Sequence, residues 1–239
     1  EGVIGMEQKY PGGIEDCSRF EELVELFESE EQRNYYYDKA QEEVEQEFER
    51  SGVRWYRSDD LVYGGLMMLL YSWNFAATET KQMEGEMIKE ILKRHHEEIE
   101  GVRDISLLDA DLGAGSSVHE VVNSVFPDLK EHLGQTGTAK ALSLLNPDLF
   151  VMWDTAIRDA GKQGAVVRGV KYYMQEQGFY DGNLSDFDGD KENYLDYLRY
   201  CQQVLEDVQY CQFMQKKDSP PAKLLDEALY AYYKIENEE

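Results

Sequence analysis

The segment 133–154, LGQTGTAKALSLLNPDLFVMWD, decides how this chain is expected to fold. Its two glycines, Gly134 and Gly137, separate apolar stretches, which is typical of two short helices joined by a turn. We therefore expect a helical hairpin within 128–146. A further apolar stretch then leads to Asp154, which stands where a helix N-cap belongs.

The turn of this hairpin is a candidate binding site. Helices at about 128–133 and 137–146 would direct several backbone N–H groups out of one helix N-terminus. Such donors bind phosphate without needing a basic surface. The candidate DNA-binding residues are those of the turn and the start of the second helix: Gly134, Gln135, Thr136, Gly137, Thr138 and Lys140.

Apolar residues recur at helical spacing through most of the remaining chain, and no segment shows the alternation of a strand. The predicted helices cover about 18–50, 59–76, 80–100, 117–127, 154 onward, 164–176, 194–208 and the segment after Ser219. Ser117 and Glu120 form a predicted capping box, and Pro127 is expected to end that helix. The sequence therefore predicts an all-α protein, an orthogonal helical domain and not a regular bundle.

The length of 239 residues suits one large domain or two small ones that share a core. We divide the chain into an acidic N-terminal helical region (1–57), a core with the hairpin (58–180) and C-terminal helices that pack on that core (181–239).

The net charge of −25 is unevenly distributed. So acidic a chain should repel nucleic acid and anionic membranes at long range, and adaptation to a saline cytoplasm or plain solubility explains it. Mimicry of nucleic acid is the alternative. Segment 128–180 is different, with six acidic and six basic residues. We expect its bases to form the only non-acidic face, around the glycine turn: Lys130, Lys140, Arg158, Lys162, Arg168 and Lys171.

The cysteines and the apolar segments bear on location. Cys17, Cys201 and Cys211 are odd in number and form no C-x-x-C pair, which favours reduced thiols in the cytoplasm. The first residues are mixed and acidic, so we expect no signal peptide. The uncharged segment 61–78 contains glycines and is flanked by acids, which favours a buried helix over a membrane span.

The hairpin and the segment after it resemble the helix-hairpin-helix DNA glycosylases, whose pattern is L-P-G-V-G-x-K-T-A followed by V-D-T-H. Leu133 and Gly137 match the outer positions of the hairpin, and 153–155 matches the V-D-T step. The chain is more similar still to uncharacterised microbial proteins with a K-x-L-x-x-x-x-P-x-L-F-x-x-W-D stretch. The resemblance covers 61–160 loosely and 133–157 well.

Several positions depart from the glycosylase pattern. Gly134 replaces the proline and Gln135 the first glycine, and Ala156 stands at the histidine. Ala139 aligns with the lysine that forms a Schiff base in some members, and Lys140 follows one residue later. One residue turns a helix side chain by about 100°. Lys140 is therefore expected to contact phosphate, not to act as a nucleophile.

The resemblance implies hydrolysis of the N-glycosidic bond of a flipped, modified or damaged base, with DNA as partner and no cofactor. Asp154 and Lys140 are the candidate catalytic residues, with Asp154 stabilising the developing cation. The alternative is a non-catalytic hairpin module that binds DNA or a protein partner. A third reading is an acidic interaction protein that acts through its charge. The same resemblance makes Trp73, Asn74 and Trp153 candidate pocket residues, although a core role for Trp73 is the simpler interpretation.

Two further patterns are weak. His95 and His96 are adjacent and do not share a helix face, so we expect no metal there. Segment 186–190, DFDGD, is similar to a calcium loop but lacks the glycine at its sixth position, which favours an acidic turn before a helix.

Overall fold

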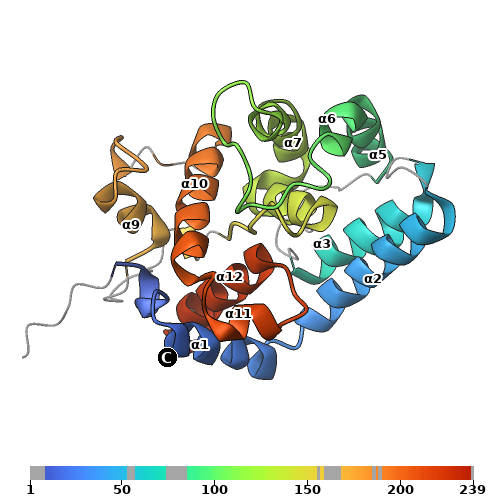
Figure 1. Cartoon of the computed structure of the whole chain (residues 1–239). Coiled ribbons are helices and arrows are strands. Elements are labelled where there is room, and N and C mark those ends of the chain that lie inside the picture. The colour runs from blue at the N-terminus through green and yellow to red at the C-terminus, as the bar shows by residue number, and fades with distance from the viewer. Residues whose placement is uncertain are drawn as a thin grey trace, which may run out of the picture.

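The structure, a computed structural model, describes residues 9–52, 57–73, 85–154, 157–158, 168–184, 187 and 190–237. All regular structure in these ranges is helical, so the predicted all-α class is confirmed (Figure 1). The N-terminal part contains η1 (Pro11–Gly13), α1 (Cys17–Glu30), α2 (Asn34–Ser51), η3 (Asp60–Met67), α3 (Met68–Trp73), α5 (Gly85–Arg94) and α6 (His96–Glu100). The C-terminal part contains α7 (Ser117–Leu145), α9 (Val170–Glu176), α10 (Lys191–Val208), α11 (Gln212–Lys216), α12 (Pro221–Tyr230) and η5 (Ala231–Glu236).

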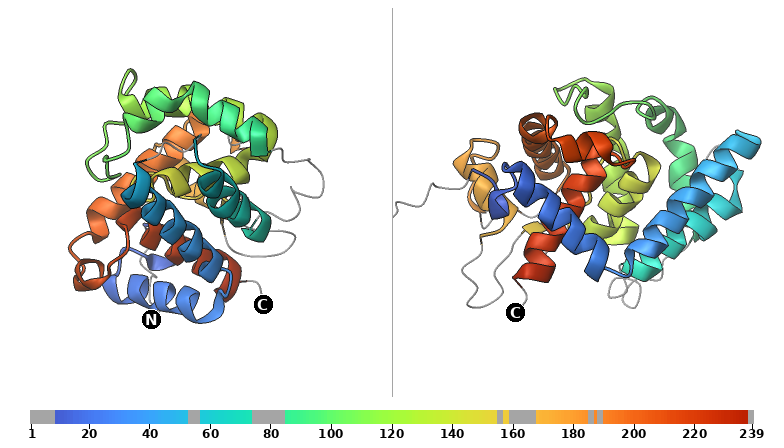
Figure 2. Two further views of the ribbon diagram at one scale, coloured as in Figure 1. Left: turned by 90° about the vertical axis from the view of Figure 1, so that its right-hand side faces the viewer. Right: turned by 60° about the horizontal axis from the view of Figure 1, so that its bottom comes forward.

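One hydrophobic core joins the three regions that the sequence delimits, with Phe20, Leu142 and Leu225 among its fully buried members. Helix α1 packs against α12 and η5, so the two ends of the described chain lie side by side (Figures 1 and 2). Helix α2 packs against η3 and α3, and α10 packs against α7 and α12. Helix α12 therefore lies at the centre of the molecule, where α1 and α10 cover it.

Helix α7 covers the region of the predicted hairpin as two helical halves that meet at a kink at Gly134, and it differs from the prediction in three respects. Its N-cap is Ser116, whose hydroxyl accepts a hydrogen bond from the backbone N–H of His119, so the predicted cap at Ser117 is off by one residue. The helix also continues through Pro127. A proline inside a helix costs about 3 kcal/mol, and burial of the flanking Val125 and Phe126 against the core offsets that cost.

The turn of the hairpin is a single residue, Gly134, with φ 70° and ψ 175°. This backbone conformation is confined almost entirely to glycine. The predicted turn at 134–137 is therefore too long, because the second helical half of α7 begins directly after Gly134 and not at Gly137. The hydroxyl of Thr138 donates to the carbonyl of Gly134 at 2.7 Å and so closes the turn from within.

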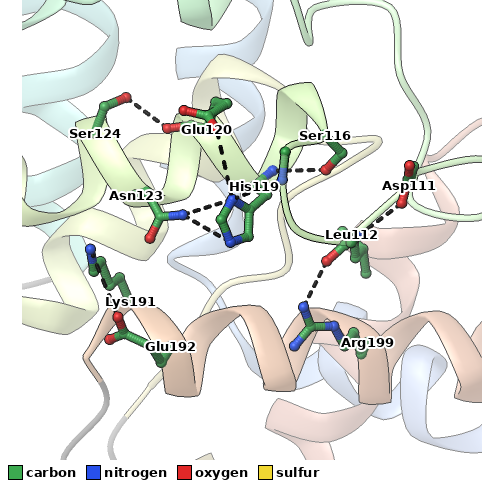
Figure 3. Close-up of polar contacts among 12 residues, drawn as sticks. Asp111, Leu112, Ser116, His119, Glu120, Asn123, Ser124, Lys191, Glu192 and Arg199 are labelled. Carbon is green, nitrogen blue, oxygen red and sulfur yellow. Dashed lines mark hydrogen bonds and ion pairs between the residues drawn. The ribbon is translucent and has the colours of Figure 1, made fainter.

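The segment 101–116, between α6 and α7, has no regular structure but is held by side chains of the surrounding helices. Arg199 of α10 donates to the carbonyl of Leu112 at 2.7 Å, as Figure 3 shows beside the Ser116 cap. Gln202 of α10 donates to two further carbonyls of the segment, and so does Asn146 at the end of α7. Helices α7 and α10 are thereby fixed to one another at this end of the molecule.

Cys17 and Cys211 form a disulfide across 194 residues of sequence, so the prediction that these thiols are reduced is wrong. The physical reason is the packing of α1 against the C-terminal helices, which brings the two cysteines together and which sequence spacing does not reveal. Cys201 is free and buried, as expected for a small apolar residue of the core.

Within the described ranges, no helix is long and apolar enough to cross a membrane. The apolar helix predicted around 61–78 is described as far as Trp73. Its tyrosines, Tyr63 and Tyr71, are exposed, and Met68 is partly buried. The remaining aliphatic side chains there are buried in the core: Leu61, Val62, Leu66, Met67, Leu69 and Leu70. This confirms the buried-helix prediction for the described part of the segment.

Candidate functional site

The structure brings together the two residues that the sequence singles out for chemistry. Lys140 lies in the second half of α7, and Asp154 lies beyond the end of that helix. The Nζ atom of Lys140 is 3.9 Å from Oδ2 of Asp154. Lys140 therefore faces Asp154 in spite of its one-residue offset from the glycosylase pattern.

The two members of this pair differ in accessibility. The Lys140 side chain is only 3% exposed, whereas the Asp154 side chain is 28% exposed. Burial lowers the pKa of the Lys140 ammonium, and the Asp154 carboxylate opposes that change. Asp154 is therefore the member that a molecule from outside can reach, and Lys140 supports it from within.

The chain that carries Asp154 is held by the long helix α10. The hydroxyl of Tyr194 donates to the carbonyl of Val151 at 2.9 Å, and that of Tyr197 donates to the carbonyl of Met152 at 3.2 Å. The backbone carbonyl of Asp154 accepts from the N–H of residue 158 at 2.9 Å, which is the bond pattern of an N-cap residue. Asp154 is thus presented from a rigid support at the start of a helical turn.

The predicted DNA-binding residues of the turn divide into two groups. Gly137, Thr138 and Lys140 are buried, whereas Gly134, Gln135 and Thr136 are partly exposed. The Gln135 side-chain oxygen accepts from Arg158 at 2.6 Å, so the turn contacts the segment that begins at Asp154. The accessible part of the turn therefore lies close to Asp154.

The six bases of segment 128–180 do not all reach a surface. Lys140 is buried, so its predicted place on a non-acidic face is wrong; its ammonium lies in the interior with Asp154. Arg168 is exposed and forms an ion pair with Glu176. Lys130, Arg158 and Lys171 are partly exposed, and Lys162 lies outside the described residues.

The candidate pocket residues can be placed only in part. Trp153 is buried, stacks on Phe187 and meets the edge of Tyr197 at 4.5 Å between ring centroids. It therefore packs as a core residue beneath Asp154. The side chain of Trp73 and the whole of Asn74 lie outside the described residues.

Sequence reasoning missed the charged side chains that α12 contributes. Lys223, Asp226 and Glu227 are each at most 6% exposed. Nζ of Lys223 donates to Glu227 at 2.6 Å and to Asn34 of α2 at 3.0 Å, and it lies 4.3 Å from the ring of Tyr37. Their spacing of i, i+3 and i+4 places them on one face of the helix, a pattern that ordinarily indicates a solvent-exposed face, so the sequence carries no signal of their burial.

Electrostatic interactions connect this helix to the Lys140–Asp154 pair. Lys140 interacts with Asp226 as well as with Asp154, and Tyr230 of α12 interacts with Asp154. Arg33, in the turn between α1 and α2, donates to the hydroxyl of Tyr230. The site is therefore a buried charged cluster at the junction of α2, α7 and α12.

A pocket of about 290 Å³ opens at the far side of this cluster, above Lys223 and Glu227. Carboxylates dominate its walls: Glu28, Asp38, Glu42, Glu45, Asp218 and Glu227. Because these carboxylates repel anions, this pocket is unsuited to a phosphate-bearing ligand.

The residues of the two weaker sequence patterns have structural roles where the structure describes them. His95 lies between α5 and α6 and its Nε2 is 2.9 Å from the Asp128 carboxylate. No group of residues in the described ranges could hold a metal ion. Most of the predicted acidic turn at 186–190 lies outside these ranges, but Asp190 is the N-cap of α10 and accepts from the N–H of Asn193 at 2.9 Å.

Comparisons of the chain with protein-family models, with curated proteins and with solved structures found no match. The geometry of the site is therefore the basis for any functional assignment.

Proposed function

We propose that this chain is a DNA glycosylase of the helix-hairpin-helix type that hydrolyses the N-glycosidic bond of a flipped, modified or damaged base. The supporting observation is the pairing of Lys140 with Asp154 after a helix that is broken at a glycine. These are the elements whose order along the sequence resembles that family. The spacing of 14 positions between the two residues is shorter than the family pattern implies.

In this proposal Asp154 is the group that faces the substrate. Cleavage of a glycosidic bond passes through a cation-like transition state, and a fixed carboxylate stabilises such a cation most where water is excluded. Asp154 is partly exposed and its backbone is fixed, which suits this role. The buried Lys140 positions the carboxylate, and we expect no covalent bond between its amine and the sugar.

The accessible part of the turn would hold the DNA backbone. Gly134, Gln135 and Thr136 are partly exposed and lie where the second half of α7 begins, so in this proposal their backbone N–H groups and the Thr136 hydroxyl contact phosphate. Contacts of this kind need few basic side chains, which suits an acidic protein. The orthogonal arrangement of the helices expected for a glycosylase is part of the same proposal.

The direct test incubates the full chain with duplexes that each carry one modified base, followed by alkali to break the DNA at abasic sites. We expect alkali-dependent breaks with at least one duplex. Treatment with borohydride during the reaction should trap no covalent adduct, because Lys140 is enclosed. An adduct that disappears in Lys140→Met would contradict the hydrolytic mechanism.

The second candidate function is a hairpin module that binds without chemistry. The burial of Lys140 favours this alternative, because a lysine at 3% exposure also suits a purely structural ion pair. Retention of a duplex by the chain, with no abasic site formed from any modified base, would select it over the enzyme.

We also propose a cytoplasmic location, which is the location that the sequence predicts. The Cys17–Cys211 disulfide weakens it, because the cytosol of most organisms keeps such thiols reduced. Alkylation of free thiols at the moment of cell lysis decides the matter: three labelled cysteines support the cytoplasmic prediction, and one labelled cysteine opposes it.

A further inference from the structure

The charges in the buried cluster do not balance. Two ammonium groups, Lys140 and Lys223, lie among three carboxyl groups, those of Asp154, Asp226 and Glu227. The nearby guanidinium of Arg33 does not change this balance, because it pairs with the Glu31 carboxylate at 2.5 Å. Lys223 pairs with Glu227 at 2.6 Å, and Lys140 pairs with Asp154 at 3.9 Å. Asp226 is the carboxyl left over.

Asp226 is almost entirely buried. It is 5% exposed, and within the described part of the chain no hydrogen bond or ion pair joins it to another side chain. The titratable groups that face it come from four places: Lys223 and Glu227 of α12, Lys140 of α7 with Asp154 beyond it, Tyr194, Tyr197 and Cys201 of α10, and Tyr37 of α2. Of these, only the two lysines carry positive charge.

An isolated carboxylate is costly to bury, so such a group holds its proton unless nearby cations compensate. Lys223 is already committed to Glu227 and to Asn34. Lys223 opposes the rise in the pKa of Asp226 most strongly, and Lys140 is the second cation, which ionised Asp226 would share with Asp154.

We propose that Asp226 is a positioning residue of the glycosylase site, which controls through Lys140 how much of the Asp154 charge is available to the substrate. This inference rests on the proposed function. When Asp226 is protonated, Lys140 neutralises Asp154 alone. When Asp226 ionises, Lys140 is shared, and the cluster gains a negative charge that stabilises the cationic transition state.

Asp226 should change its protonation state near neutral pH. Burial raises its pKa to about 7, against the opposing effect of the Lys223 ammonium and, more weakly, that of Lys140. The acidic limb of the pH–rate profile should therefore belong to Asp226, with a rate that rises through its pKa from a lower plateau, where Asp226 is protonated, to a higher one, where it is ionised.

The first part of the test does not depend on activity. Carboxyl titrations are followed by NMR in the full chain with ¹³C-labelled aspartate, and the signal that Asp226→Asn removes is assigned to Asp226. We expect it to titrate near neutral pH, and Lys140→Met should raise its pKa by removing a cation. Asp148 is the matched control, because burial alone raises its pKa and Lys140→Met should leave it unchanged. An Asp226 signal unaffected by Lys140→Met would overturn the proposal.

The second part uses base release from a duplex that the wild type cleaves. At all pH values Asp226→Asn should release the base at the slow rate that the wild type shows when Asp226 is protonated. Asp148→Asn should keep the pH–rate profile of the wild type. Base release with the same pH profile in Asp226→Asn overturns the role of Asp226 and leaves the proposed function intact. Coupled titration without base release from any duplex overturns both.

Discussion

At the scale of single residues, the unusual feature is the number of charges that the interior contains. Lys223 and Glu227 are each about 5% exposed, and their ion pair is also supported by Asn34 and the ring of Tyr37. Although burial by itself lowers the pKa of Lys223, the Glu227 carboxylate and the Tyr37 phenol leave it raised overall. A buried pair of this kind is strongly unfavourable once one partner is removed, whatever its own net contribution.

Lys223→Met should therefore destabilise the protein by about 3–5 kcal/mol, because Glu227 loses its ion-pair partner and Asp226 loses the cation that most favours its ionised form. The double variant Lys223→Met/Glu227→Leu should recover most of this loss, because it replaces the pair with apolar groups. Urea unfolding of the two variants and the wild type measures both effects. Equal destabilisation of the single and double variants would show that packing, and not charge, dominates at this position.

Asp226 also predicts how stability depends on pH. Its folded-state pKa of about 7 lies above that of an unfolded aspartate, so the folded state binds the proton more tightly. This contribution is fully present below the unfolded pKa and is lost as the pH rises through 7. Asp226→Asn does not titrate and so lacks this pH dependence. The free energy of unfolding of the variant, relative to that of the wild type, should therefore rise by about 2–3 kcal/mol between pH 5 and pH 8. Denaturant unfolding at the two pH values measures the gain, and a difference between the two proteins that is independent of pH would contradict it.

The sequence predicted part of this residue-scale picture. Lys140 and Asp154 were identifiable because a glycine turn, a lysine, a proline and a Trp-Asp step follow one another in 133–154. The charged residues of α12 were not, because lysine and glutamate on a helix usually face solvent. Only the position of α12 at the centre of the molecule makes their burial apparent.

At the scale of elements, the turn at Gly134 sets the geometry of the site. The sequence offers Gly134 and Gly137 as turn residues, and propensity alone does not distinguish them. The backbone does, because Gly134 takes φ 70° and ψ 175° while Gly137 lies inside the helix. The predicted starts of two other helical segments are likewise wrong by one residue. Ser116 caps α7 in place of Ser117, and Pro220 precedes α12 where Ser219 was expected.

Gly134→Ala should destabilise the protein by about 1–3 kcal/mol, because an L residue is strained in that conformation. It should also weaken any cleavage or DNA binding, since Gln135 and Lys140 depend on the start of this helical half. Gly64→Ala is the matched control. Gly64 lies in a helix with nothing within 4 Å of an added Cβ, so this change should be neutral or slightly stabilising. Thermal melting compares the two, and equal effects would contradict the role of the turn.

At the scale of the whole molecule, the disulfide and the packing of α1 connect the beginning of the chain to its end. The Cys17–Cys211 bond closes a loop of 194 residues, and α1 covers α12, which carries the buried charges. The sequence pattern predicts most of the helices but not this closure, because contacts between distant segments leave no local periodicity. An odd number of cysteines likewise pointed to free thiols until the fold paired two of them.

Loss of this disulfide should cost about 2–5 kcal/mol, because it releases a long loop in the unfolded chain. Cys17→Ser, Cys211→Ser and the double variant should all lose the same amount, since each removes the same bond. Guanidinium unfolding under non-reducing conditions measures the three. A double variant that is much less stable than either single variant would mean that the two cysteines contribute separately.

The central claim is that Asp154 acts in chemistry and not only in the fold. Base release and melting temperature, measured together for wild type and Asp154→Asn, test it most directly. The change keeps the size of the side chain and much of its capping ability but removes the charge that would stabilise the cation. We expect the rate of base release to fall about 10²–10³-fold, with no more than about 1 kcal/mol lost in stability. A variant that releases the base at the wild-type rate but melts several degrees lower would contradict the account and make Asp154 a structural cap.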